Sequence, residues 1–480
     1  ALLGFFGRIN YDYKSRYLFE VSGRYDGTSR FAKGNRWGFF PSASVGWRIS
    51  EEPFFLPARR LVDNLKIRAS FGSLGNQNVS SYYTFARLVS IANLNYTFGE
   101  GSVLPKYSTL GAPIASDMTW ETAQQWDFGF DLTMLGNRLN LTVDGYIRDT
   151  RDMLTDGVEL PSVYGASMPE MNAADLRTKG YEITLNWHDQ LTLGGKPFEY
   201  SIGVNLSDYK SIVTKYDNQD KTFARDFYEG MEIGEIWGFV TDGLFQTDEE
   251  AQAYADQVDL TYVLKGQTGG WQAGDVKFVD LNGDNKVNIG SNNVNAPGDR
   301  KILGNSLPSL SYGITASVRW NGIDVSAFFQ GTGNHYWYPD GESMPFWGAY
   351  SYPYLSFLQK DFLQDVWSTD NTDAYFPRAM AYSASSGVLS NINDRYLQNI
   401  RYLRFKNLTV GYTLPQQWTQ KAGIESVRVY FTGENLCYWS PLKKHSKYVD
   451  PEGAIDRSGA YNNAFYPWQK SFLFGIDVTF

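Results

Sequence analysis

The chain has 480 residues, a formal net charge of -9 and an aromatic content of 16%. The acidic balance argues against nucleic-acid binding, which calls for a basic surface, and no apolar run reaches the roughly 18 residues of a transmembrane helix. A single cysteine, Cys437, rules out an intrachain disulfide. Many aromatics without long apolar runs are typical of membrane β-barrels, whose outward-facing and inward-facing residues alternate.

The first residues, ALLGFFGRINYDY, contain neither an initiator Met nor a leader with a basic and an apolar part. Alternation begins within them, since Gly7, Ile9 and Tyr11 are interleaved with Arg8 and Asn10. We therefore expect the chain to be part of a longer protein and to enter a strand almost at once.

The same period of two recurs to the end of the chain, where Phe472, Phe474 and the terminal Phe480 share one strand face. The fold class we predict is all-β, a transmembrane antiparallel up-and-down β-barrel. We expect about 13 strands, at residues 5–13, 17–26, 37–49, 65–73, 126–134, 137–149, 181–188, 198–207, 310–320, 323–330, 402–412, 427–435 and 471–480.

The connections between these strands alternate between short and long, which is the layout of outer-membrane barrels with turns on the periplasmic side and loops outside. This parity places Phe480 on the periplasmic side. Asn321-Gly322 predicts a tight hairpin turn, and a switch of apolar phase predicts a β-bulge near Lys406-Asn407. The main extracellular loops are expected at about residues 72–125, 150–180, 208–309, 331–401 and 436–470.

Several long phrases resemble one protein family. They are FFGRINYDYKSRYLFEVSGRYDGTSRFAKGNRWGFFPSASVGWRISEEPFF, LKIRASFGSLGNQ, GEIWGFVTDGLFQ, VKFVDLNGDNKVN, YLRFKNLTVGYTLP and VRVYFTGENL, in chain order from Phe5. On these phrases the chain closely resembles the SusC/RagA family of TonB-linked (TonB-dependent) outer-membrane transporters of Bacteroidetes.

The resemblance implies a barrel of about 22 strands, of which residues 1–480 would form the C-terminal portion, with the plug domain and the early strands lying upstream. It implies a SusD-like surface lipoprotein as lid, and TonB-ExbB-ExbD as the energy source acting through the plug. The implied activity is import of nutrient oligomers, mostly oligosaccharides (glycans), with oligopeptides as the alternative. Outside transport, the alternatives are a passive structural or adhesion barrel and a barrel hydrolase.

The segment DLNGDNK predicts a possible Ca²⁺ loop, because oxygen ligands at positions 1, 3, 5 and 7 can wrap a hard cation. Position 12, which is Glu in an EF-hand, is Ser291 here. The alternative is an Asx-turn in which the side chains bond their own backbone. The candidate ligands are Asp280, Asn282, Asp284, Lys286 through its carbonyl, and Asp299.

Aromatic rings concentrate in the loop at residues 331–401, and a further tryptophan lies in the last loop. Flat rings with polar edges stack on sugars, but they also bind peptides, build loop cores and pack against partners. The candidate substrate-binding residues are Trp337, Tyr338, Trp347, Tyr350 and Trp439.

We expect no enzymatic activity. The three histidines, His188, His335 and His445, show no triad-like spacing with Ser or Asp, and no P-loop or dinucleotide motif is present. Residues 247–258 predict a short surface helix with a capping box at Thr247 and Glu250.

Overall fold

The structure is a computed structural model that describes residues 1–79, 84–96, 104–111, 113–115, 117–157, 163, 170–265, 269–354, 358, 360–446, 448–454 and 468–480. Within these ranges, no helix combines the length and the apolar character needed to cross a membrane.

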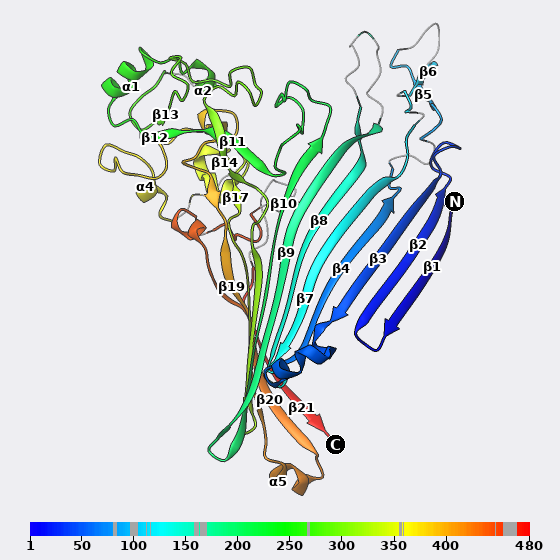
Figure 1. The fold of residues 1–480 in the computed structure, drawn as a ribbon. Coiled ribbons are helices and arrows are strands. Elements are labelled where there is room, and N and C mark those ends of the chain that lie inside the picture. Colours follow the sequence, from blue (N-terminus) through cyan, green and yellow to red (C-terminus); the bar gives the residue numbers. More distant parts are fainter. Residues whose placement is uncertain are drawn as a thin grey trace. The chain divides into compact units, whose positions relative to one another are not determined.

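One sheet of 13 strands dominates the fold, and its strand order follows the chain (Figure 1). The predicted strand number and all-β class are therefore confirmed. The strands are β1 (Leu2–Tyr13), β2 (Tyr17–Thr28), β3 (Trp37–Arg48), β4 (Val62–Asn76), β7 (Glu121–Met134), β8 (Leu139–Asp156), β9 (Glu170–Leu193), β10 (Lys196–Lys215), β15 (Ser311–Trp320), β16 (Ile323–Thr332), β19 (Tyr402–Thr413), β20 (Ser426–Trp439) and β21 (Ser471–Thr479).

Small strand pairs and short helices fill the connections. The pairs are β5 (Val89–Asn93) with β6 (Lys106–Leu110), β11 (Glu235–Phe239) with β14 (Arg300–Asn305), β12 (Thr241–Leu244) with β13 (Val276–Phe278), and β17 (Tyr336–Trp337) with β18 (Gln398–Asn399). The helices are α1 (Asp248–Ala255), α2 (Thr261–Leu264), α3 (Met344–Trp347), α4 (Phe362–Asp365) and α5 (Gln416–Thr419). The 3-10 segments are η1 (Ile49–Glu51), η2 (Pro53–Arg60), η4 (Gly348–Tyr350), η5 (Val388–Ser390), η6 (Gln420–Ala422) and η7 (Pro441–Lys444).

Local sequence signals explain several of these boundaries. Asn321 and Gly322 both have positive φ, 51° and 84°, as a type I′ hairpin turn requires. The register of β19 against β20 shifts between Phe405 and Asn407, which confirms the predicted bulge. At α1, the Thr247 side chain accepts a hydrogen bond from the Glu250 N–H at 3.1 Å and so caps the helix.

β9 and β10 extend well beyond their predicted ends, to 24 and 20 residues. The predicted loops at 150–180 and 208–309 are therefore too long at their edges. Alternation failed to mark these extensions because polar side chains fill part of their buried face: the Thr178 and Ser211 hydroxyls are buried and lie 2.8 Å apart.

The chain divides into two compact units. The first comprises residues 1–182, 209–221 and 225–232, and the second comprises residues 183–208, 222–224 and 233–480. The first has a small hydrophobic cluster of Phe31, Phe40, Met118 and Trp120. The second has a larger core built from its connections.

Residues directly opposite one another in paired strands share a face of the sheet, and we call such a row across the strands a rung. Successive rungs lie on opposite faces, and in the first unit two successive rungs differ in polarity. One rung is entirely apolar: Ile9, Val21, Ala43, Phe71, Trp126 and Ile147. The next carries polar residues around a glycine: Arg8, Ser22, Ser42, Gly72, Gln125 and Arg148. At the level of these two rungs the sheet of this unit thus has one apolar and one polar face.

Gly75 in β4 provides a test of the packing in the first unit. An alanine Cβ there would overlap the ring of Phe40, whereas nothing lies within 4 Å of a Cβ at Gly7 in β1. Gly75→Ala should therefore lower the stability of the folded barrel by about 1–3 kcal/mol through overpacking, and Gly7→Ala should leave it nearly unchanged. Heat-dependent gel migration of the full-length protein measures this, and equal melting of the two variants would contradict the packing.

Candidate functional site

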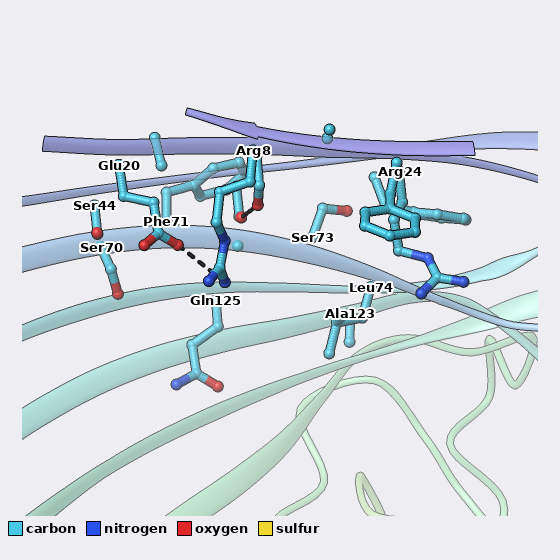
Figure 2. A pocket seen from close by; sticks show the side chains of 18 of the residues that line it. Arg8, Glu20, Arg24, Ser44, Ser70, Phe71, Ser73, Leu74, Ala123 and Gln125 are labelled. Atoms are coloured by element: carbon cyan, nitrogen blue, oxygen red, sulfur yellow. Dashed lines mark hydrogen bonds and ion pairs between the residues drawn. The ribbon is translucent and has the colours of Figure 1, made fainter. Parts of the chain in front are cut away.

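The polar face of the first unit contains a cavity of about 870 Å³ (Figure 2). Its lining includes Arg8 from β1, Glu20 and Arg24 from β2, Ser44 from β3 and Gln125 from β7. Arg8 and Glu20 form an ion pair at 3.2 Å, which Figure 2 marks with a dashed line. The cavity therefore combines these charged and polar groups with apolar side chains such as Phe6, Phe40 and Leu74.

The rung composition explains why the face is hollow at this point. Arg8 lies in β1 and Arg148 in β8, and the positions between them on the polar rung include Ser22, Ser42 and Gly72. The Ser22 and Ser42 hydroxyls lie 2.6 Å apart and bond to each other. Short side chains between long cationic ones leave room for a polar group from another molecule or segment.

An ionic cluster lies on the same face, centred on Arg68 of β4. Its guanidinium contacts Asp144 at 2.5 Å, Asp131 at 3.4 Å and Asp127 at 3.5 Å. Arg68 is paired with Gly129 in the β4–β7 ladder, and a Cβ at Gly129 would overlap both Arg68 and Asp144. The glycine therefore lets the guanidinium reach across β7 to β8.

A second cavity, of about 530 Å³, adjoins this cluster and is lined by Asp12, Glu20, Lys66, Arg68 and Asp127 among others. Both cavities thus offer cations and carboxylates on one strand face. Such a wall can bind polar groups by charge-assisted hydrogen bonds. Alternation along each strand had marked most of these residues as polar-face positions, but only the register between strands shows which of them meet.

Four of the five rings predicted to bind substrate belong instead to the interior of the second unit. Trp347 and Tyr350 have no exposed surface, and Trp337 is 7% exposed. Trp347 donates to the carbonyl of Pro339 at 3.0 Å, and the Tyr338 hydroxyl donates to the carbonyl of Leu389 at 2.7 Å. These rings are enclosed and hydrogen-bonded to their own connections, so the structure assigns them to a loop core rather than to ligand contact.

Trp439, the fifth ring, is 55% exposed, but it lies on the apolar strand face. Trp439 pairs with Leu403. The next rung on the same face includes Phe405 and Phe329, whose rings stack with centroids 4.4 Å apart. The predicted contact of Trp439 with substrate stays a prediction. Sequence alone had placed it in a loop, whereas it ends β20.

The DLNGDNK loop is a network of Asx-type bonds. Asp280 accepts from the N–H groups of Gly283 and Asn285 at 2.7 and 2.8 Å, and Asp284 accepts from that of Lys286 at 2.9 Å. Asp299 accepts from the N–H of Asn288 at 2.8 Å. In the described part of the chain, no group of three or more His, Cys, Asp or Glu side chains is arranged to hold a metal. The backbone bonds account for these acidic side chains, and the Ca²⁺ site stays a prediction.

His445 is half-buried beside the core of the second unit and stacks on Tyr375, with ring centroids 3.6 Å apart. Burial, together with the nearby cations Lys444 and Arg395, lowers the pKa of His445 to about 4. The imidazole is therefore neutral when packed against Tyr375 at neutral pH.

Comparison with known proteins gives concordant results. A family model described as "TonB dependent receptor-like, beta-barrel" matches residues 2–472. TonB-dependent receptor P3 of Formosa agariphila and TonB-dependent receptor SusC of Bacteroides thetaiotaomicron are each 29% identical to the chain; each alignment covers 100% of the chain, with 45% and 44% of the respective relatives. The solved structure of the RagAB peptide transporter shares the fold, with a TM-score of 0.73 and 22% identity, over 100% of this chain and 48% of that one.

The chain thus spans about half the length of the relatives it matches. The resemblance to the SusC/RagA family, expected from the sequence phrases, is confirmed.

Removing the guanidinium of Arg68 should destabilise the ionic cluster that it forms with Asp127, Asp131 and Asp144. Arg68→Met leaves three carboxylates around one site without their shared cation, and it should lower stability by about 1–3 kcal/mol. Arg68→Lys should retain part of the stability, and adding Asp144→Asn to Arg68→Met should recover part of it. Thermal melting of the full-length protein measures all three, and identical melting of the three variants and the parent would refute the cluster's structural role.

His445 predicts a pH effect with a defined sign. The pKa of His445 falls from 6.5 to about 4 on folding. Between these two pH values His445 is therefore protonated in the unfolded loop and neutral in the folded loop. Stability of the loop core should be constant above about pH 6.5 and decrease as the pH drops toward 4. Loop proteolysis should be faster at pH 5 than at pH 7.5, relative to a His445→Phe variant that keeps the ring stack. His188→Gln serves as the control and should keep the parent's pH dependence; a pH response that survives in His445→Phe would rule out this origin.

Proposed function

We propose that this chain, which belongs to the TonB-dependent receptor-like β-barrel family, forms the C-terminal part of an outer-membrane importer of nutrient oligomers. The cargo we propose is an oligosaccharide. The C-terminus would lie on the periplasmic side, because Thr479 pairs with Ser426, next to the connection that carries α5.

The observation that carries this proposal is the two-faced sheet. The apolar rung presents large exposed side chains such as Ile9, 70% exposed, and Trp126, 53% exposed, which suit contact with hydrocarbon. The adjacent polar rung, which includes Arg8 and Arg148, suits contact with a plug domain or a hydrated cargo. A passive barrel would need no such concentration of paired charges around Arg68.

The proposed partners follow from family membership. Upstream segments of the same protein would supply the plug and the contact with TonB-ExbB-ExbD, and a SusD-like lipoprotein would cover the long connections. Support comes from the relative named SusC, which is similar over all of this chain. Hydrogen-bonding groups such as Ser44 and Gln125 in the cavity are compatible with sugar hydroxyls.

Oligopeptides are the second candidate cargo. A protein of the same fold is described as a peptide transporter, and the arginines of the polar rung, Arg8 and Arg148, would complement peptide carboxylates.

Import is tested with the full-length transporter in its own host. Cells that carry the gene should take up labelled oligosaccharide, and both gene deletion and a protonophore should stop uptake because the plug must be pulled by an energised partner. Mass spectrometry of small molecules that co-purify with the transporter then identifies the cargo. Glycans are the expected result and peptides would favour the second candidate, whereas uptake of neither class, or uptake insensitive to the protonophore, would refute the proposal.

A further inference from the structure

The second unit contains a separate cavity of about 780 Å³ where β15, β16, β19 and β20 meet their long connections. Its lining includes Tyr312, Arg401, Leu403, Tyr438, Trp439 and Lys443. None of the residues on the polar face of the first unit contributes to it.

The cavity adjoins the apolar face of the sheet. A single outward rung crosses five strands at its level: Leu206, Tyr312, Gly331, Leu403 and Trp439. The next rung on the same face is equally apolar, with Val204, Ile314, Phe329, Phe405 and Cys437. The cavity therefore lies at the long-connection end of the surface that suits hydrocarbon, among the Tyr and Trp rings typical of a membrane interface.

The charge of the cavity is unlike that of the chain as a whole. The chain carries a formal charge of -9, yet the cavity has two cationic side chains, Arg401 and Lys443, and no Asp or Glu among the described residues that line it. The carboxylates of Asp450 and Glu452 are engaged by Arg404 and Lys406. An anion is thus the complementary ligand.

Lys443 is fixed in position. Its ammonium donates to the carbonyl of Tyr438 at 2.5 Å and lies 3.7 Å from the centroid of the Tyr438 ring. An ammonium has three N–H donors, so beside the carbonyl and the ring of Tyr438 a donor stays available for a ligand. The backbone N–H of Arg401 donates to the side chain of Asn399 at 3.1 Å, which anchors the residue while its side chain remains exposed.

We propose that this cavity binds the phosphate-bearing headgroup of a membrane lipid in the leaflet on the long-connection side. Arg401 and Lys443 would hold the phosphate by charge-assisted hydrogen bonds. The acyl chains would lie along the two apolar rungs, against rings such as Trp439 and Phe405. This lipid role is distinct from cargo import and does not depend on which cargo is carried.

The test uses the purified, delipidated full-length transporter with two probes, lipid A and the same lipid stripped of its phosphates. Native mass spectrometry should show lipid A binding at least about tenfold more tightly, since charge-assisted bonds carry the recognition. The double variant Arg401→Gln/Lys443→Gln should lose this preference, whereas Lys421→Gln, an exposed lysine in η6, should keep it. Equal binding of both lipids by the parent protein, or an unchanged preference in the double variant, would overturn the proposal.

A second measurement needs no variant. Cys437 lines the cavity, so bound lipid A should slow its reaction with a water-soluble maleimide, followed by peptide mass spectrometry, and phosphate-free lipid should not. Binding of inorganic phosphate, measured in the same way, shows whether the cavity recognises a lipid or any free phosphate anion. If phosphate alone binds as tightly as lipid A, or if lipid A leaves the labelling rate of Cys437 unchanged, the cavity is no lipid site.

Discussion

A segment that crosses hydrocarbon must satisfy every backbone N–H and C=O within the protein, because an unpaired group there costs several kcal/mol. Paired strands meet this requirement, and pairing fixes which side chains share a face. The rungs of both units follow from it: Ile9 and Trp126 lie on one face, while Arg8 and Gln125 lie on the other. The two sheet faces, and the cavities on them, are consequences of strand register.

Side-chain size along a rung then determines the shape of each face. Serine and glycine between Arg8 and Arg148 leave a hollow, and Gly129 opens the path by which Arg68 reaches Asp144. On the apolar face of the second unit, Gly331 leaves space for the Tyr312 ring, which a Cβ at position 331 would overlap. Small residues therefore shape both the polar wall and the proposed lipid site.

The sequence predicted the features that depend on local rules. Strand number, the Asn321-Gly322 turn and the bulge at Lys406-Asn407 each follow from alternation or backbone preference within a few residues. The meeting of Arg68 with Asp144 depends on register between distant strands, which alternation does not specify. The burial of Trp347 and Tyr350 depends on how long connections fold on themselves, and an aromatic-rich loop is compatible with either a core or a binding surface.

The central claim, that one face meets lipid and the other a hydrated interior, is tested most directly on two adjacent residues of β15. Val318 pairs with Tyr200 and Val325 on the apolar face, and Ser317 pairs with Ser201 and Ser326 on the polar face. Nitroxide labels at Val318→Cys and Ser317→Cys, each in the full-length protein with its native cysteines, Cys437 included, replaced by serine and placed in lipid nanodiscs, report local accessibility by electron paramagnetic resonance. Relaxation of the label at 318 should respond to oxygen, which partitions into lipid, and that at 317 to a water-soluble nickel complex. The reverse pattern, or equal access of the nickel complex to both labels, would contradict the two-faced barrel.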